Sequence, residues 1–285
     1  MTKIIAFIDA SSYAHSVCDH AAWVAARMGA SIEILHAIGR RDASGDAGDF
    51  SGALQADARD TLLAELSALD QQNAKLAQKR GRLILEQAKT RLNAAGITEV
   101  AIKLRIGDLV DAVQEFEGDA DLIVIGKRGE AAAFAHQHLG SNLERVVRAS
   151  HKPILVASRA FRPIHRVLIA FDGGPSVTRA VEFLARSYAS FAGLDMRLLK
   201  VGQCTDDAAR RVETSANQLR GAGYLVQSSI VAGQPEVEIA RTVEADTIDL
   251  LVMGAYGHSR IRSLIIGSTT TEMIRSCKIP VVLFR

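Results

Sequence analysis

The sequence predicts an α/β protein built from two tandem domains, each with a doubly wound, five-stranded parallel sheet. At 285 residues the chain is too long for one ordinary core and suits two domains of about 140 residues each. Its landmarks occur twice in the same order, and apolar runs alternate with amphipathic segments in each copy. This alternation indicates parallel strands with helices on both faces. We therefore expect one domain over residues 1–160 and another over residues 161–285.

The repeat is carried by four pairs of segments. They are Lys3–Asp9 with Arg166–Asp172, Asp121–Gly126 with Asp249–Gly254, Gly140-Ser141 with Gly267-Ser268, and Lys152–Val156 with Ile279–Leu283. Similarity at a fixed offset is the signature of an internal repeat. Gly126 and Gly254 are 128 residues apart, but Asp9 and Asp172 are 163 residues apart. The first half therefore holds about 35 extra residues between its first and fourth strands.

The second half shows the order of elements most clearly. Strands are expected at Val167–Asp172, Met196–Val201, Leu225–Val231, Leu250–Gly254 and Val281–Phe284. Helices are expected to begin near Ser176, Asp206, Glu236 and Ser268. Gly193 and Gly221 lie where two of these helices are expected to end. Pro163 breaks any helix in the linker Ser158–His165 between the halves.

The extra residues of the first half lie within the segment Arg40–Arg91, which is rich in Ala, Leu, Gln and Lys and lacks proline. Leucines recur there at near-helical spacing, at Leu63, Leu66, Leu69 and Leu76. This pattern predicts one or two long helices. The segment could form an arm that binds a partner, but we favour an elongated second helix that covers its own sheet.

Composition excludes several classes of function. A net charge of +2 and an aromatic content of 5% argue against nucleic-acid binding. No apolar run approaches the roughly 20 residues that cross a bilayer, so no membrane association is expected. The three cysteines, Cys18, Cys204 and Cys277, are far apart. They fit a reducing, cytoplasmic location and predict no disulfide framework, and no clustered pattern predicts a metal site.

Three features of the second half are expected to meet at one crevice, because doubly wound sheets bind ligands beyond the carboxyl ends of their strands. Asp172 ends the first strand, Gly254 and Gly257 follow the fourth, and Gly267 and Ser268 open the last helix. Glycines permit a close backbone approach to a ligand. Amides at a helix N-terminus favour phosphate, and the hydroxyls of Ser268, Thr269 and Thr270 add donors. A carboxylate would repel phosphate, so Asp172 is better placed to contact the adenosine end of a bound nucleotide.

These residues resemble the Gly-x2-Gly-x9-Gly-Ser/Thr signature of ATP-binding universal stress proteins, as Gly254-x2-Gly257-x9-Gly267-Ser268. The likeness covers the whole chain twice, apart from the insertion. It implies an adenine nucleotide α-hydrolase-like fold with sheet order 3-2-1-4-5, and a stress-response regulatory protein that binds ATP, with or without Mg²⁺, or another adenine nucleotide. The resemblance implies that Asp172 binds ribose and that Val201 lines the adenine pocket. It also implies that Gly254 and Gly257 border ribose and triphosphate, and that phosphate oxygens are bound by Gly267, Ser268 and Thr269.

The first half departs from this signature. Its candidate residues are Asp9, Gly126, Gly129, Gly140 and Ser141, with ten residues in place of nine before Gly140. Two cations, Lys127 and Arg128, fill the first gap and could favour a triphosphate. We expect nucleotide to bind mainly through the second half.

Other interpretations of these residues stay open. Glycines after a strand often form only a tight turn, a Gly-Ser pair often only caps a helix, and Asp9 and Asp172 could equally cap helices. Some members of the family bind no nucleotide, so a nucleotide-free stress-response scaffold remains an alternative, with Leu54–Leu92 as the arm that holds a partner. The sequence identifies no protein partner.

An enzyme that cleaves the α–β phosphate bond is the third alternative. Enzymes of this fold commonly carry Ser-Gly-Gly-x-Asp-Ser after the first strand, where this chain has Phe171–Ser176. Neither a Walker loop nor a Gly-x-Gly-x-x-Gly fingerprint is present. His258 is the one tempting general base, and we interpret it as a solvated loop histidine. We expect no enzyme, and any ATP hydrolysis to be slow and incidental.

The closing strands of the two halves are apolar and need cover as sheet edges. They are Ile154–Ala157 and Val281–Phe284. The resemblance implies that they pair with each other, which makes the chain a pseudo-dimer, or with a second molecule, which would make a homodimer.

Overall fold

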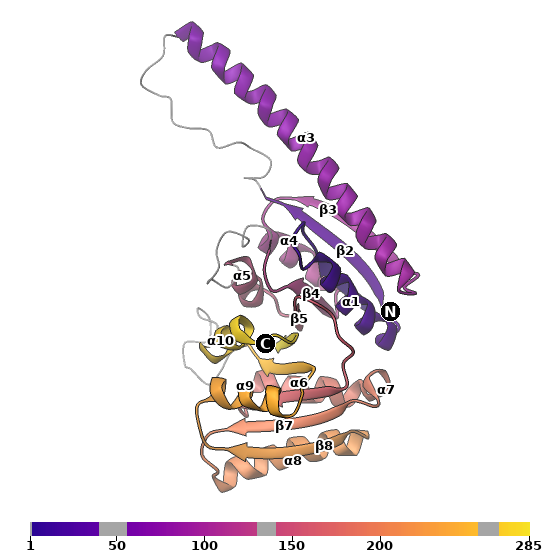
Figure 1. Cartoon of the computed structure of the whole chain (residues 1–285), viewed down its shortest axis with the longest axis vertical. Helices are drawn as coiled ribbons and strands as arrows, with labels where there is room; N and C mark the ends of the chain where they lie inside the picture. Colours follow the sequence, from indigo (N-terminus) through magenta and orange to yellow (C-terminus); the bar gives the residue numbers. More distant parts are fainter. Residues whose placement is uncertain (1, 40–55, 130–140, 256–267) are drawn as a thin grey trace.

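The computed structural model describes residues 2–39, 56–129, 141–255 and 268–285, except for the side chains of residues 56–61 and 141. Its strands form one ten-stranded sheet in the order β3-β2-β1-β4-β5-β10-β9-β6-β7-β8 (Figure 1). The first half supplies β1 (Lys3–Phe7), β2 (Ser31–Ile38), β3 (Val100–Ile106), β4 (Leu122–Gly126) and β5 (Ile154–Ala157). The second half supplies β6 (Arg166–Ala170), β7 (Asp195–Val201), β8 (Leu225–Val231), β9 (Leu250–Gly254) and β10 (Val281–Phe284). Each half therefore has the expected order 3-2-1-4-5.

Helices cover both faces of the sheet. The first half contributes α1 (Ala14–Met28), α3 (Ala56–Ala94), α4 (Leu109–Phe116), the short 3-10 helix η1 (Glu117–Asp119) and α5 (Ser141–Ala149). The second half contributes α6 (Pro175–Arg186), α7 (Tyr188–Phe191), α8 (Asp206–Ala222), α9 (Pro235–Ala245) and α10 (Ser268–Ser276). One core layer takes its apolar side chains from α1, α3, α6 and α8, and the other from α4, α5, α9 and α10. Apolar strands covered on both sides are what a parallel sheet requires.

The two halves join through their closing strands, which pair with each other. β5 and β10 run antiparallel, with Leu155 opposite Val282. The two expected parallel sheets are thus halves of one mixed sheet. Each of the two core layers contains buried residues from both halves. Neither closing strand is left as an exposed edge, so the expectation of a pseudo-dimer is confirmed.

Local sequence explains where α8 begins and ends. The hydroxyl of Thr205 accepts a hydrogen bond of 3.2 Å from the amide of Ala208 and so caps the first turn. The helix ends at Gly223, whose φ of +115° lies in the left-handed region. The expectation that Gly221 ends this helix was wrong, because Gly221 lies within it and the left-handed residue is two positions later. Gly193, with φ of +81°, follows α7 as expected.

The described part of the insertion, from residue 56 on, forms a helix, α3, of 39 residues. Its C-terminal part packs on β2, β3 and α1 through Leu85, Ala88 and Leu92, which are all buried. Gly81 lies at this contact, where a methyl group would lie 2.7 Å from Cδ1 of Leu104 and would force that side chain to move. The N-terminal part of α3 projects well beyond the sheet (Figure 1). The expected elongated helix is therefore present, but it covers the sheet with only part of its length.

Candidate functional site

The candidate site of the second half lies at the carboxyl ends of β6, β7 and β9. Ala170 in β6 is opposite Leu199 in β7 and Met253 in β9. Two residues further along the chain, this register brings Asp172 level with Val201, and Gly254 ends the neighbouring strand on the other side. All three are half-buried. Three residues expected to contact one ligand thus lie at one edge of the sheet, with Val201 and Gly254 at the ends of their strands and Asp172 two residues beyond the end of β6.

A tight turn holds the carboxylate of Asp172 at this edge. Its Oδ1 accepts a hydrogen bond of 2.8 Å from the amide of Gly174. A methyl group on Gly174 would lie 3.1 and 3.2 Å from the two carboxylate oxygens, which is tighter than ordinary contact. Gly173 has φ of +79°, which favours glycine. The N-cap of α6 is Gly174, with Pro175 in the first turn. Asp172 therefore shapes the turn before α6 and is not its N-cap.

A hydroxyl joins the end of β9 to the start of α10. Oγ1 of Thr270 donates a hydrogen bond of 3.1 Å to the carbonyl oxygen of Gly254. Thr270 is buried, Thr269 is half-buried and Ser268 is exposed at the first residue of the helix. The Thr270 hydroxyl was expected as a phosphate donor, but its proton is already engaged. The first turn of α10 is thereby fixed beside the end of β9, where the signature requires it.

Some of the candidate residues lie outside the part of the chain that the structure describes. This applies to Gly257, Gly267 and His258 in the second half and to Gly140 in the first. Ser141 begins α5 as expected of the residue after Gly140, but its side chain is not described.

The first half repeats the aspartate turn. Oδ1 of Asp9 accepts a hydrogen bond of 2.9 Å from the amide of Ser11. A methyl group on Gly129 would lie 3.0 Å from Oδ2 of Asp9, so these two candidate residues lie side by side. Gly126 is required for space, since a methyl group there would lie 2.9 Å from Cβ of Tyr13. The two halves therefore present an acid at the same place in the fold.

Lys127, expected to favour a triphosphate in the first half, instead contacts the second half. Its Nζ donates a hydrogen bond of 2.8 Å to the carbonyl oxygen of Cys277, just after α10. Burial is the main cause that lowers the pKa of this amine to about 8; Cys277 acts in the opposite direction, and Arg128 adds a smaller effect that lowers the pKa. No sequence signal could have revealed this role, because it depends on how the halves pack.

Arg211, which sequence reasoning missed, brings a cation near the Asp172 turn. A methyl group on Gly173 would lie 3.7 Å from Cδ of Arg211, so the arginine side chain passes over that glycine. Its guanidinium also pairs with Asp207, one turn earlier on α8, at 2.8 Å. The i, i+4 spacing predicts this ion pair from sequence, but the contact with Gly173 depends on the packing of α8.

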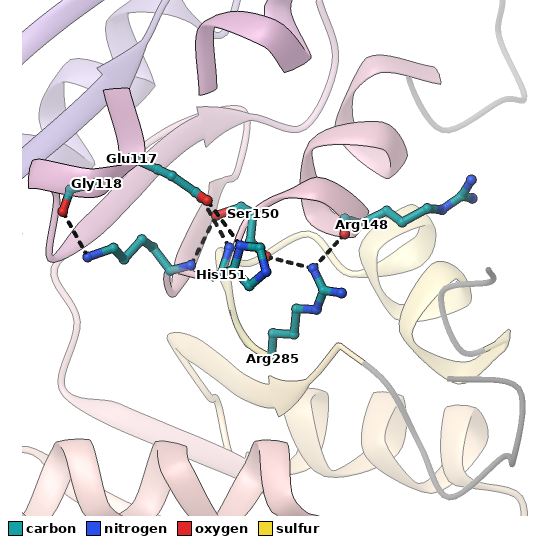
Figure 2. Close-up of polar contacts among 7 residues, drawn as sticks. Glu117, Gly118, Arg148, Ser150, His151 and Arg285 are labelled. Atoms are coloured by element: carbon teal, nitrogen blue, oxygen red, sulfur yellow. Dashed lines mark hydrogen bonds and ion pairs between the residues drawn. The ribbon is translucent and has the colours of Figure 1, made fainter. Parts of the chain in front are cut away.

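A second polar contact joins the halves near the chain terminus (Figure 2). Arg285 donates hydrogen bonds to the carbonyl oxygens of Arg148 at 2.7 Å and Ser150 at 3.3 Å. Beside it, Glu117 accepts hydrogen bonds from the amide of His151 and lies 3.1 Å from its ring nitrogen (Figure 2). Burial would raise the pKa of Glu117, but hydrogen bonds from Ser150 and His151 hold it below its ordinary value. A cation from each half thus caps a helix C-terminus of the other.

Among the residues that the structure describes, no group of three His, Cys, Asp or Glu side chains is placed to hold a metal ion. In the same part of the chain, no helix combines the length and apolar character needed to cross a membrane.

Comparison with known proteins identifies the family of this chain. The model of the universal stress protein family matches residues 1–158 and 163–285. The chain belongs to the universal stress protein family. Universal stress protein Slr1230 of Synechocystis sp. is 38% identical over 288 residues, and the alignment covers 100% of both chains.

Solved universal stress proteins show the same fold. The crystal structure of one from Archaeoglobus fulgidus has a TM-score of 0.74 at 20% identity, and covers 99% of this chain and 98% of that one. The fold is therefore the adenine nucleotide α-hydrolase-like fold of the family. A universal stress protein solved in complex with cAMP matches 55% of this chain and 95% of its own, at 23% identity and a TM-score of 0.36.

Proposed function

We propose that this chain is a stress-response regulatory protein that binds ATP, mainly through its second half, and does not catalyse efficient turnover. The observation that carries the proposal is the hydrogen bond from Thr270 to Gly254, because it fixes the start of α10 against the end of β9. Backbone amides at a helix N-terminus attract phosphate, and Ser268 and Thr269, which the resemblance implies bind phosphate oxygens, occupy that first turn.

The other end of the same edge suits an adenosine. Asp172 presents a carboxylate that can accept hydrogen bonds from ribose hydroxyls, and it is held in place by the amide of Gly174. Val201 is apolar, half-buried and level with it on β7, as the lining of an adenine pocket should be. We expect Mg²⁺ to accompany ATP through the phosphate oxygens, since Mg²⁺ is commonly bound in this way.

The first half is the weaker candidate. Its acid, Asp9, lies in the equivalent turn. However, Lys127, the cation that follows β4, is directed to the carbonyl oxygen of Cys277. This asymmetry supports the proposal that nucleotide binds mainly through the second half.

Calorimetry with ATP tests the proposal on a matched pair of variants. Asp172→Ala should bind ATP about 10- to 100-fold more weakly, the cost of a lost hydrogen bond to a charged group. Asp9→Ala removes the equivalent acid and should bind almost as the wild type does. Asp172→Asn keeps an oxygen for the Gly174 amide and controls for damage to the turn. An unchanged affinity in Asp172→Ala, or no binding by the wild type, overturns the proposal.

Absence of efficient catalysis has its own measurement. The purified protein should hydrolyse ATP more slowly than about 1 s⁻¹, the low end of ordinary enzymatic rates. A faster rate that disappears together with ATP binding in Asp172→Ala would make the protein an enzyme.

A further inference from the structure

The outer face of α3 carries a row of exposed leucines. Leu69, Leu76 and Leu83 leave 51%, 64% and 57% of their surface exposed. Leu62 continues the row, so four leucines recur at intervals of seven. The row lies across the helix from Leu85 and from the other side chains that pack on the sheet. This face is therefore turned away from the rest of the described residues.

A spacing of seven is the repeat of a coiled coil. Two turns of a straight helix take about 7.2 residues, and leucines at every seventh position keep one seam toward a partner helix only if the helices supercoil. A helix that merely covers its own sheet needs apolar residues on one face only, and α3 already has them. Its second, opposite row of leucines thus fits a helical partner.

The charges along α3 indicate which helix that partner is. Between residues 62 and 74 the only charged residues are the acidic Glu65 and Asp70. Between residues 75 and 83 the only charged residues are basic, namely Lys75, Lys79, Arg80 and Arg82. Two copies side by side in parallel would bring like charges together. Two antiparallel copies place the acidic segment of each against the basic segment of the other.

We propose that two copies of this chain associate through an antiparallel coiled coil of their α3 helices. If the two helices cross at the midpoint between Ala74 and Lys75, Leu66 of each copy lies level with Leu83 of the other. Both leucines are equally far from that midpoint along the sequence. The N-terminal part of α3, which would carry this contact, projects beyond the sheet (Figure 1). This inference does not depend on nucleotide binding.

Sedimentation of the full chain over a range of concentrations tests the association. The wild type should dimerise, and Leu69→Gln with Leu76→Gln should raise the dimer dissociation constant at least tenfold. Leu225→Gln replaces a leucine that is 76% exposed on β8 and should leave dimerisation unchanged. A wild type that is monomeric at about 0.1 mM, or a dimer unaffected by the paired change, overturns the proposal.

Charge reversal tests the orientation and the identity of the partner. Glu65→Lys with Asp70→Lys should weaken the dimer, and so should Lys79→Glu with Arg82→Glu, because each leaves like charges opposed. All four changes in one chain should restore it to within about threefold of the wild-type dissociation constant, since each reversed acid then again faces a reversed base, while Lys75 and Arg80 are unchanged. A parallel dimer would not respond in this pattern, and failure of the four-fold variant to recover overturns the antiparallel arrangement.

Discussion

The Nζ atom of Lys127 donates a hydrogen bond of 2.8 Å to the carbonyl oxygen of Cys277 and so joins the loop after β4 to the end of α10. The carbonyl groups at the end of a helix lack partners within it, and a cation is favoured there. Arg285 makes the reciprocal contact, since it caps α5 of the first half at Arg148 and Ser150. The halves are therefore linked by polar contacts as well as by the pairing of β5 with β10.

Stability should respond to alkaline pH through Lys127. Burial lowers its pKa from 10.5 to about 8 in the folded protein. Between these values the unfolded chain binds more protons, so this group's contribution to the free energy of unfolding rises with pH. Below pH 8 the amine is charged in both states and its contribution is constant.

Urea unfolding of the wild type and Lys127→Met at pH 7.5 and pH 10 measures this effect. The wild type should gain stability relative to the variant at the higher pH. Lys278→Met, which changes an exposed lysine beside Cys277, should follow the wild type. Equal pH responses of wild type and Lys127→Met would show that the amine keeps an ordinary pKa.

The hydroxyl of Thr270 should stabilise both the fold and the candidate site. Thr270→Val keeps the shape of the side chain but leaves the Gly254 carbonyl oxygen without this donor, at a cost of about 1–2 kcal/mol in the free energy of unfolding. ATP should also bind several-fold more weakly, because the start of α10 is less firmly held. Thr271→Val, at a half-buried neighbouring position, is the control. Urea unfolding and calorimetry should distinguish the two variants, and equal losses would contradict the role of the Thr270 contact.

The sequence allowed the strands to be placed within about two residues, because continuous apolar runs bounded by turn residues mark buried parallel strands. The strand expected at Val167–Asp172 is Arg166–Ala170, and the one expected at Leu225–Val231 has those bounds. The resemblance supplied the order 3-2-1-4-5, which periodicity alone does not contain. The end of α8 was misplaced because Gly221 and Gly223 are both plausible caps, and only the backbone angle separates them.

The candidate site was predictable in its parts and not in its surroundings. Adjacent strands of a parallel sheet end at one edge, so Asp172 and Gly254 could be expected there together. The contacts of Lys127 and Arg211 depend on which helix packs beside each loop. The local sequence does not determine this packing. The hydroxyl of Thr270 was expected to donate to phosphate. Thr270 and Gly254 are 16 residues apart in the sequence, and nothing in the sequence indicates that they are in contact.

The two halves should unfold as one unit. Leu155 lies in β5, is 1% exposed and stands opposite Val282 of β10, within a core layer shared by both halves. Leu155→Ala should cost about 2–5 kcal/mol, as large-to-small changes in a core do. Hydrogen exchange should then accelerate in β9 and β6 as well as in β4. Leu225→Ala, at an exposed position, should cost less than about 0.5 kcal/mol. Acceleration confined to the first half would show that the halves unfold separately.

The ring of His20 should make the protein sensitive to acid. His20 is fully buried, its Nδ1 lies 2.7 Å from the carbonyl oxygen of Ser16, and its ring meets Phe161 edge-on with centroids 5.1 Å apart. Nε2 has no hydrogen-bond partner among the described residues. Burial lowers the pKa of this histidine below 6.5, although the Ser16 carbonyl and Asp19 act in the opposite direction.

Because the folded pKa is the lower one, the unfolded chain binds more protons as the pH falls through 6.5, and the wild type should lose stability there. One such group contributes at most about 1.4 kcal/mol per pH unit. His20→Leu removes the titrating group and should lose less stability than the wild type between pH 7 and pH 5. His15→Leu, on an exposed position of the same helix, should keep the wild-type response. If His20→Leu is as acid-sensitive as the wild type, protonation of the buried imidazole is not the cause of the acid sensitivity. The packing between α1 and Phe161 of the linker is then lost through another group.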